Sequence, residues 1–252
     1  MSAPRLTFPR LIPLLLLMLA CSLRPASAQA PLIADLDDHL IAITTGFAGA
    51  DVLLFGTTDG PGDVIVVVKG PTSDVEVKRK ERIGGIWINR KGLGFQNVPS
   101  VYMLASSKPL EELLPADQRA FYQMGLENVR MVPVSPDDTD LKDFTKALVH
   151  AKQKFGLFSD MPARILFIGD RLFRVNLRMP STVPTGTYLA EVYLVRDQKV
   201  VGAQTTPLVI SKIGFGADIY DFAHRHGAAY GVIAVLVALF AGWMAHLAFR
   251  RR

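Results

Sequence analysis

One stretch of the chain, between residues 78 and 91, gathers positively charged side chains around a tryptophan. Trp87 lies among the cations, which are Lys78, Arg79, Lys80, Arg82, Arg90 and Lys91. Guanidinium and ammonium groups bind carboxylates and phosphates, and an indole ring adds apolar surface beside them. The combination predicts a surface that grips an anionic ligand, lipid headgroups or an acidic protein surface.

The same residues also fit a purely structural interpretation. Val75 and Val77 alternate with Glu76 and Lys78, as in a half-buried strand. The cations can then belong to the exposed faces of two strands, where lysines protect a sheet edge from mispairing. A tryptophan such as Trp87 is more often a core residue than a binding platform. The sequence leaves both interpretations open.

Other groups of titratable residues are explained by local structure. The acids and the histidine in residues 35–39 lack the Gly and Glu of an EF-hand loop. The acids at 137–140 follow Ser135-Pro136, which is typical of the first turn of a helix. His224 and His226 have no further ligand types beside them in the sequence. We expect no metal site and no cofactor.

Motifs of common hydrolases and nucleotide-binding enzymes are missing. The sequence contains no GxSxG, no HExxH and no phosphate-binding loop. Its single cysteine, Cys21, lies near the N-terminus. We therefore expect a protein without enzymatic activity.

A second candidate contact surface lies in an apolar stretch near the C-terminus. Its small residues recur every three or four positions, on one face of a helix: Gly227, Gly231, Ala234, Ala238 and Gly242. Small residues let membrane helices approach closely, so the pattern predicts a contact with a partner helix or with a second copy. Because membrane helices are rich in Gly and Ala in general, the pattern also fits a helix without a protein partner.

The stretch that carries these small residues predicts a transmembrane helix. Residues 227–249 contain no Asp, Glu, Lys or Arg, and the arginines 250–252 follow. At about 1.5 Å per residue, such a helix crosses a hydrocarbon core of about 30 Å. Arginines favour the cytoplasmic side, so we expect residues 250–252 to be a cytoplasmic tail.

The N-terminus predicts export. Residues 1–28 combine Arg5 and Arg10, a short apolar stretch and the sequence Ala26-Ser27-Ala28, as in a cleaved signal peptide. An uncleaved signal anchor and lipidation at Cys21 are the alternatives. With the C-terminal span, the sequence predicts a single-pass protein whose N-terminal domain lies outside the cytoplasm.

The excess of basic residues belongs to this topology. The chain has 28 Lys and Arg against 23 Asp and Glu. Without the six arginines of the signal and the tail, basic residues no longer outnumber acidic ones. The charge therefore gives no reason to expect nucleic acid as a partner.

Residues 29–213 predict a mainly β domain. Short apolar segments separated by Gly and Pro turns, such as Val64–Lys69, and strict alternation over Phe173–Met179 indicate strands. The V-P-x-G-x-Y turn at Val183–Tyr188 is typical of immunoglobulin-like sandwiches. We expect an immunoglobulin-like β-sandwich, as one domain or two.

A helical insertion is expected at about residues 109–158. Its longest helix should begin at Ser135-Pro136 and carry apolar residues at helical spacing, namely Leu141, Phe144, Leu148 and Phe155. Residues 214–226 should form a juxtamembrane linker.

Several stretches resemble a family of alphaproteobacterial transmembrane proteins of undetermined function. They are VKRKERIGGIWINRKG (77–92), NVPSVYMLASSKPLEELL (97–114), LFRVNLRMPSTVPTGTYLAEVYLV (172–195), and the pairs Tyr230-Gly231 and Gly242-Trp243. The resemblance covers nearly all of the expected mature chain and implies a bacterial inner-membrane protein with a periplasmic domain. Genes of this family often lie near sulfite-exporter-like permeases, which implies an accessory role in transport.

Two functions are compatible with these features. The first is a non-enzymatic accessory or assembly partner of a multi-pass transporter, for example a sulfite-exporter-like anion permease. The second is a stand-alone tethered binding module for an anionic ligand or envelope component, using residues 78–91. The expected partners are the lipid bilayer and another integral membrane protein, and a homo-oligomer through the span is compatible with both functions.

Overall fold

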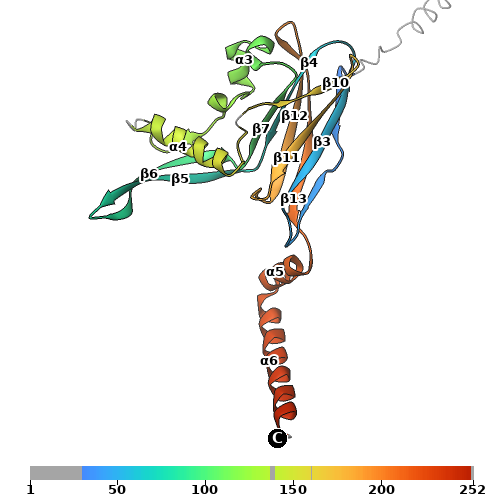
Figure 1. Cartoon of the computed structure of the whole chain (residues 1–252). Coiled ribbons are helices and arrows are strands. Elements are labelled where there is room, and N and C mark those ends of the chain that lie inside the picture. Colours follow the sequence, from blue (N-terminus) through green and yellow to red (C-terminus); the bar gives the residue numbers. More distant parts are fainter. Residues whose placement is uncertain (1–29, 137–139, 160, 251–252) are drawn as a thin grey trace, which may run out of the picture. The chain divides into compact units, whose positions relative to one another are not determined.

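The computed structural model describes residues 30–136, 140–159 and 161–250, and strands dominate this part of the chain (Figure 1). The predicted signal peptide with Cys21, the acids Asp137 and Asp138, and Arg251–Arg252 lie outside the described residues.

The larger sheet has six strands, and its central strand is buried on both faces. The order is β2 (Leu40–Ile43), β13 (Lys199–Lys212), β12 (Gly186–Arg196), β4 (Asp63–Lys69), β7 (Tyr102–Ser106) and β9 (Ala163–Arg164). In β4, every residue from Val64 to Val68 is buried. This explains why the segment is a continuous apolar run and does not alternate.

The smaller sheet has four strands, in the order β1 (Leu32–Leu36), β3 (Gly49–Thr58), β11 (Leu172–Pro180) and β10 (Leu166–Ile168). Strand β11 alternates between buried and exposed residues, as its sequence predicts. Its inner face packs with the inner residues of β3, β4 and β12 in one core. The two sheets therefore form a β-sandwich, which confirms the mainly β class.

The sandwich is a single one, because strands from both ends of the domain share each sheet. Strand β11 pairs with β3, and β12 pairs with β4. At the predicted V-P-x-G-x-Y turn, the Tyr188 hydroxyl donates to the Pro184 carbonyl at 2.7 Å and holds the corner before β12. The narrower immunoglobulin-like class stays a prediction.

Short helices cover the outer face of the six-stranded sheet. They are α2 (Leu110–Leu113), α3 (Ala116–Phe121) and the single 3₁₀ turn η1 (Leu126–Asn128). From this region, Leu113, Leu114 and Met124 pack on Ile65 and Val67 of β4.

The third sheet is a long hairpin with one short added strand. It consists of β5 (Thr72–Ile83), β6 (Ile86–Pro99) and β8 (Val132–Pro133). Helix α4 (Leu141–Lys154) packs on the base of this hairpin through Phe144 and Leu148, which share a small core with Leu93, Phe95 and Val98.

The predicted start of this helix is wrong. The helix begins at Leu141 after Asp140, and not at Ser135-Pro136. The Val134 N–H donates to the Gly94 carbonyl at 2.9 Å, which continues the pairing of β8 with β6 and keeps the chain extended there. Tertiary pairing thus overrides a local capping signal. Phe155, expected on the apolar face, follows the helix and is exposed.

Two helices end the described chain. Helix α5 (Phe215–Arg225) occupies most of the predicted linker, and α6 (Gly227–Phe249) coincides with the predicted span. His226 between them has φ −130° and ψ 50°, which interrupts the helical backbone. Helix α6 has no buried residue and is long and apolar enough to cross a membrane.

Candidate interaction site

The β5–β6 hairpin brings the predicted cations together around a tight glycine turn. Gly84 and Gly85 have φ values of +59° and +88°, which suit glycine in a two-residue hairpin loop. The turn aligns Ile83 with Ile86 and Arg82 with Trp87. We call residues Lys80 to Asn89 the hairpin tip, since their pairing is regular and no other element pairs with them.

The register separates the tip into two faces with different chemistry. One face carries Ile83, Ile86 and Ile88, together with Glu81, because directly paired residues point to the same side. The other face carries Trp87, the directly opposite Arg82, and Lys80. The end of the hairpin is therefore apolar on one face and aromatic and cationic on the other.

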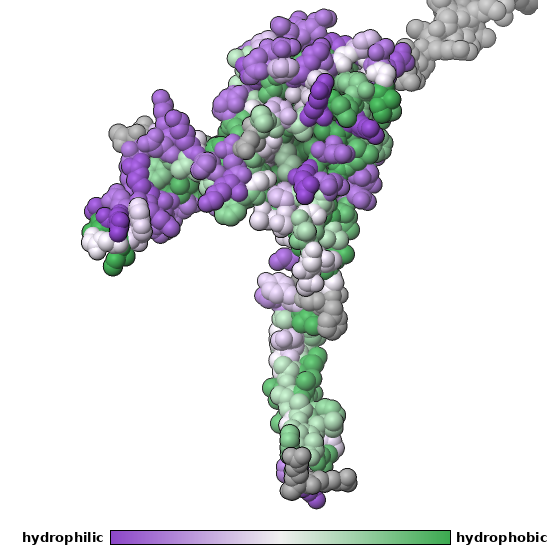
Figure 2. All heavy atoms as spheres, in the orientation of Figure 1, coloured by the Kyte–Doolittle hydropathy of each residue, from purple (hydrophilic) through white to green (hydrophobic). Residues whose placement is uncertain are grey.

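The apolar side chains of the tip are open to solvent. Ile83 is 48% exposed, Ile86 69%, Trp87 65% and Ile88 41%. The structure thus does not place Trp87 in the core. Figure 2 shows hydrophobic residues at the end of the hairpin and hydrophilic ones behind them. An isolated exposed apolar residue is ordinary, whereas several of them at one end of a hairpin make the tip a candidate interaction surface.

Cations at the base of the hairpin are held by carboxylates. The Arg79 guanidinium lies 3.5 Å from Asp140 and 3.7 Å from Asp143, and 5.3 Å from the centre of the Phe144 ring. Lys91 lies 3.1 Å from the same Asp140. These contacts join the hairpin to α4, so Arg79 and Lys91 have a structural role.

The remaining cations differ in how far they are compensated. Lys78 lies 3.0 Å from Glu76, and Arg90 lies 3.2 Å from Glu81. Within the described part of the chain, Lys80 and Arg82 make no ion pair, although Arg82 Nε donates to the Gly85 carbonyl at 3.4 Å. Both lie on the Trp87 face. The predicted group of seven residues is thus divided between cations that have acidic partners and two cations of the tip, Lys80 and Arg82, for which the described residues supply none.

The small residues of α6 form an open surface. A Cβ atom added at Gly227, Gly231 or Gly242 would meet nothing within 4 Å. Ala234 and Ala238 are exposed in the same helix. Their spacing of three or four residues keeps all five on one side of α6.

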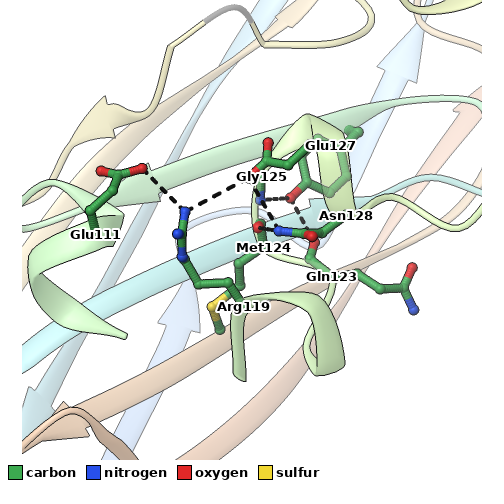
Figure 3. A network of polar contacts seen from close by, with 8 residues as sticks. Glu111, Arg119, Gln123, Met124, Gly125, Glu127 and Asn128 are labelled. Atoms are coloured by element: carbon green, nitrogen blue, oxygen red, sulfur yellow. Dashed lines mark hydrogen bonds and ion pairs between the residues drawn. The ribbon is translucent and has the colours of Figure 1, made fainter. Parts of the chain in front are cut away.

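A cavity of about 680 Å³ lies between β7, α2, η1 and the segment near Arg164. Leu104, Leu110 and Met161 contribute apolar surface, and Lys108, Glu111, Glu127 and Arg164 contribute charge. Next to it, Arg119 lies 3.2 Å from Glu111 and 3.8 Å from Glu127 (Figure 3). No local sequence pattern reveals this network, because the pairs form only when α2, α3 and η1 fold over the sheet.

Tyr102 fixes one wall of this cavity. Its hydroxyl donates to the Gln123 carbonyl at 2.8 Å and accepts from the Gly125 N–H at 2.9 Å. Burial raises the pKa of Tyr102 far above its ordinary value of 10, so the hydroxyl stays neutral. Both contacts are with residues about twenty positions away, which no local sequence pattern reveals.

The acidic and histidine residues that the structure describes do not assemble into a metal site. Among the described residues, no cluster of three or more His, Cys, Asp or Glu side chains could hold a metal ion. His39 lies 2.9 Å from Asp35, and Asp37 accepts the backbone N–H of Leu53 at 2.8 Å. The His224 ring contacts the Tyr220 carbonyl at 2.9 Å, one helical turn away.

Comparison with known proteins matches the chain to a protein family. The model of a family described as "Putative transmembrane protein (Alph_Pro_TM)" matches residues 31–251. No curated protein and no solved structure matches the chain.

Proposed function

Because the chain belongs to this alphaproteobacterial family of transmembrane proteins, we propose that it is a non-enzymatic accessory or assembly partner of a multi-pass membrane transporter. Helix α6 anchors it in the bacterial inner membrane. The β-sandwich lies in the periplasm, and the chain after α6 lies in the cytoplasm. The family resemblance implies an anion permease, for example a sulfite-exporter-like one, as the partner.

The observation that carries this proposal is the open face of α6. The helix contains no Asp, Glu, Lys or Arg, and none of its residues is buried. Five of its small residues lie on one side, namely Gly227, Gly231, Ala234, Ala238 and Gly242. In a bilayer, lipid tails are as apolar as the helix, so association depends on close backbone packing. A face of Gly and Ala is suited to receive a second helix, while the bulkier sides of α6 face lipid.

Site-specific photo-crosslinking tests this contact in living cells. A photoreactive residue replaces Ala238 on the small-residue face or Leu236 on the opposite side of α6. We expect the Ala238 position to yield adducts with a multi-pass protein and the Leu236 position to yield far fewer. The same protein should co-purify after gentle detergent extraction.

Two results would contradict the proposal. Adducts of the chain with itself alone would indicate a homo-oligomer without a transporter. Equal adduct yields from both positions would mean that the small-residue face has no specific contact.

A second candidate function is a tethered binding module for an anionic ligand or an envelope component. The observation that favours it is the pair of uncompensated cations, Lys80 and Arg82, beside the exposed Trp87. Thermal denaturation of the purified full chain with and without polyanions tests this function. We expect the midpoint to rise with a polyanion, and to rise no longer after Lys80→Glu and Arg82→Glu. A midpoint that never shifts would contradict it.

A further inference from the structure

We propose that the hairpin tip inserts into the anionic headgroup surface of the bilayer in which α6 is anchored. The inference rests on the second function proposed above and names its ligand as anionic lipid. It commits to the tip alone, residues Lys80 to Asn89, because the cations at the hairpin base already have acidic partners.

The order of side chains along the tip matches the order of layers in a leaflet. Ile83 and Ile86 flank the turn and come first, Trp87 and the directly opposite Arg82 follow, and Lys80 lies behind them. At a bilayer surface, apolar groups enter the acyl boundary, tryptophan prefers the interface, and cations contact phosphates. Long cationic side chains can keep their charges at the phosphate level while their stems cover apolar surface.

Apolar residues on both faces of the tip favour lipid over a protein partner. The three isoleucines lie on one face and Trp87 on the other, and all four are exposed. A protein surface usually covers one face of a hairpin and leaves the other in water. Lipid headgroups can surround an inserted tip on every side.

Charge gives the surface its preference for anionic lipid. Glu81 is the sole carboxylate from Lys80 to Asn89 in the sequence, and Arg90 neutralises it at 3.2 Å. Lys80 and Arg82 therefore add positive charge without an opposing carboxylate. Each such cation near an anionic leaflet strengthens binding. The anchor in α6 also keeps the domain near one bilayer, which raises the effective concentration of that surface.

Fluorescence of the full chain in proteoliposomes tests the inference. The chain has two tryptophans, so Trp243→Phe leaves Trp87 as the single reporter. The protein is reconstituted in phosphatidylcholine, with or without phosphatidylglycerol, and the lipids are brominated near the headgroup end of the acyl chains. With phosphatidylglycerol present, we expect Trp87 emission to shift to shorter wavelength and bromine quenching to increase several-fold. High salt should reverse both changes, because it screens the charges.

Variants separate the tip from the rest of the domain. The double change Lys80→Glu and Arg82→Glu should abolish the quenching, and Ile83→Ser with Ile86→Ser should do the same. Lys142→Glu with Lys146→Glu makes the same charge change on exposed residues of α4 and should keep it. Circular dichroism of each variant shows whether the β-sandwich is folded, so that lost quenching is assigned to the tip.

Three outcomes would overturn the inference. One is Trp87 emission that is equal in both lipid mixtures and fully quenched by aqueous acrylamide. Another is quenching only by brominated lipid in separate vesicles, which would mean that the tip binds a different bilayer. The third is a response to polyglutamate without a response to phosphatidylglycerol, which would indicate an acidic protein surface.

The last of these outcomes would leave the binding-module function intact, and none of them affects crosslinking through Ala238. Failure of this inference is therefore distinguishable from failure of either proposed function.

Discussion

Arg79 and Lys80 are neighbours in the chain, yet they have different roles because adjacent residues of a strand point to opposite faces. Arg79 lies at an irregularity in the pairing of β5 with β6 and contacts Asp140, Asp143 and Phe144 of the α4 region. Lys80 shares the other face with Trp87. We therefore expect Arg79 to contribute to stability and Lys80 to contribute to the proposed binding.

Single substitutions should separate these roles. Arg79→Ala removes partly exposed ion pairs and a cation–π contact, so we expect a loss of about 1 kcal/mol in the free energy of unfolding. Lys80→Ala should change it by less than about 0.5 kcal/mol. Urea unfolding of the two purified variants measures both values. A larger loss for Lys80→Ala than for Arg79→Ala would show that the roles are assigned wrongly.

The raised pKa of Tyr102 predicts that the stability of the fold decreases at alkaline pH. Its pKa is raised in the folded state, so its hydroxyl remains protonated where the unfolded tyrosine ionises. The stabilisation is complete below the ordinary pKa of 10 and is lost as pH rises above it. Each such group lowers the free energy of unfolding by at most about 1.4 kcal/mol for each pH unit above that value. Tyr193 has a raised pKa for the same reason, burial, and acts in the same direction.

The change Tyr102→Phe tests this dependence. It leaves the Gly125 N–H and the Gln123 carbonyl without their partner, which should cost about 1–3 kcal/mol at neutral pH. It should also make the decline above about pH 10 less steep, since one ionising group is removed. Urea unfolding at several pH values measures both effects, with Tyr220→Phe as the exposed control. An unchanged alkaline slope would contradict the role of Tyr102.

At the scale of elements, the hairpin and α4 stabilise each other through a core separate from that of the sandwich. Phe144→Ala should therefore destabilise this unit by about 3–5 kcal/mol, because it removes a large buried side chain. Hydrogen exchange should show lost protection in β5 and β6 and little change in β4 or β12. Phe155→Ala, at an exposed phenylalanine beside the same helix, should have almost no effect. Equal loss of protection in all strands would mean that the two cores unfold as one.

Elements were predictable from the sequence where their signal is local. The valine run of β4, the alternation of β11 and the apolar length of α6 each follow from residues within the element. The start of α4 was not predictable from its capping signal, because the pairing of β8 with β6 holds the chain extended up to Val134, directly before that signal. The residues of the candidate site were found, but their division into paired and uncompensated cations was not. Asp140 pairs with both Arg79 and Lys91, but it is 61 positions from Arg79 in the sequence, so no local pattern predicts the pairing.

The whole molecule combines one β-sandwich, a hairpin with an exposed apolar and cationic tip, and an apolar helix with an open face. Composition and hydropathy predict a mainly β domain with one membrane helix, because they reflect whether each segment lies in water, in a protein core or in lipid. They do not predict which strands share a sheet, because β3 and β11 meet across more than a hundred residues. Both proposals require that α6 crosses the membrane. The β-sandwich and the hairpin tip then lie on one side of it, and the end of α6 lies on the other side.

Cysteine accessibility tests the topology most directly. Lys142→Cys on exposed α4 and Arg250→Cys at the end of α6 are each placed in a Cys21→Ser chain, which has no other cysteine. Cells with a permeabilised outer membrane are treated with a maleimide that does not cross the inner membrane. The account predicts that Lys142→Cys is labelled at once and that Arg250→Cys is labelled only after the inner membrane is lysed. Labelling of Arg250→Cys in unlysed cells, or protection of Lys142→Cys, would contradict it.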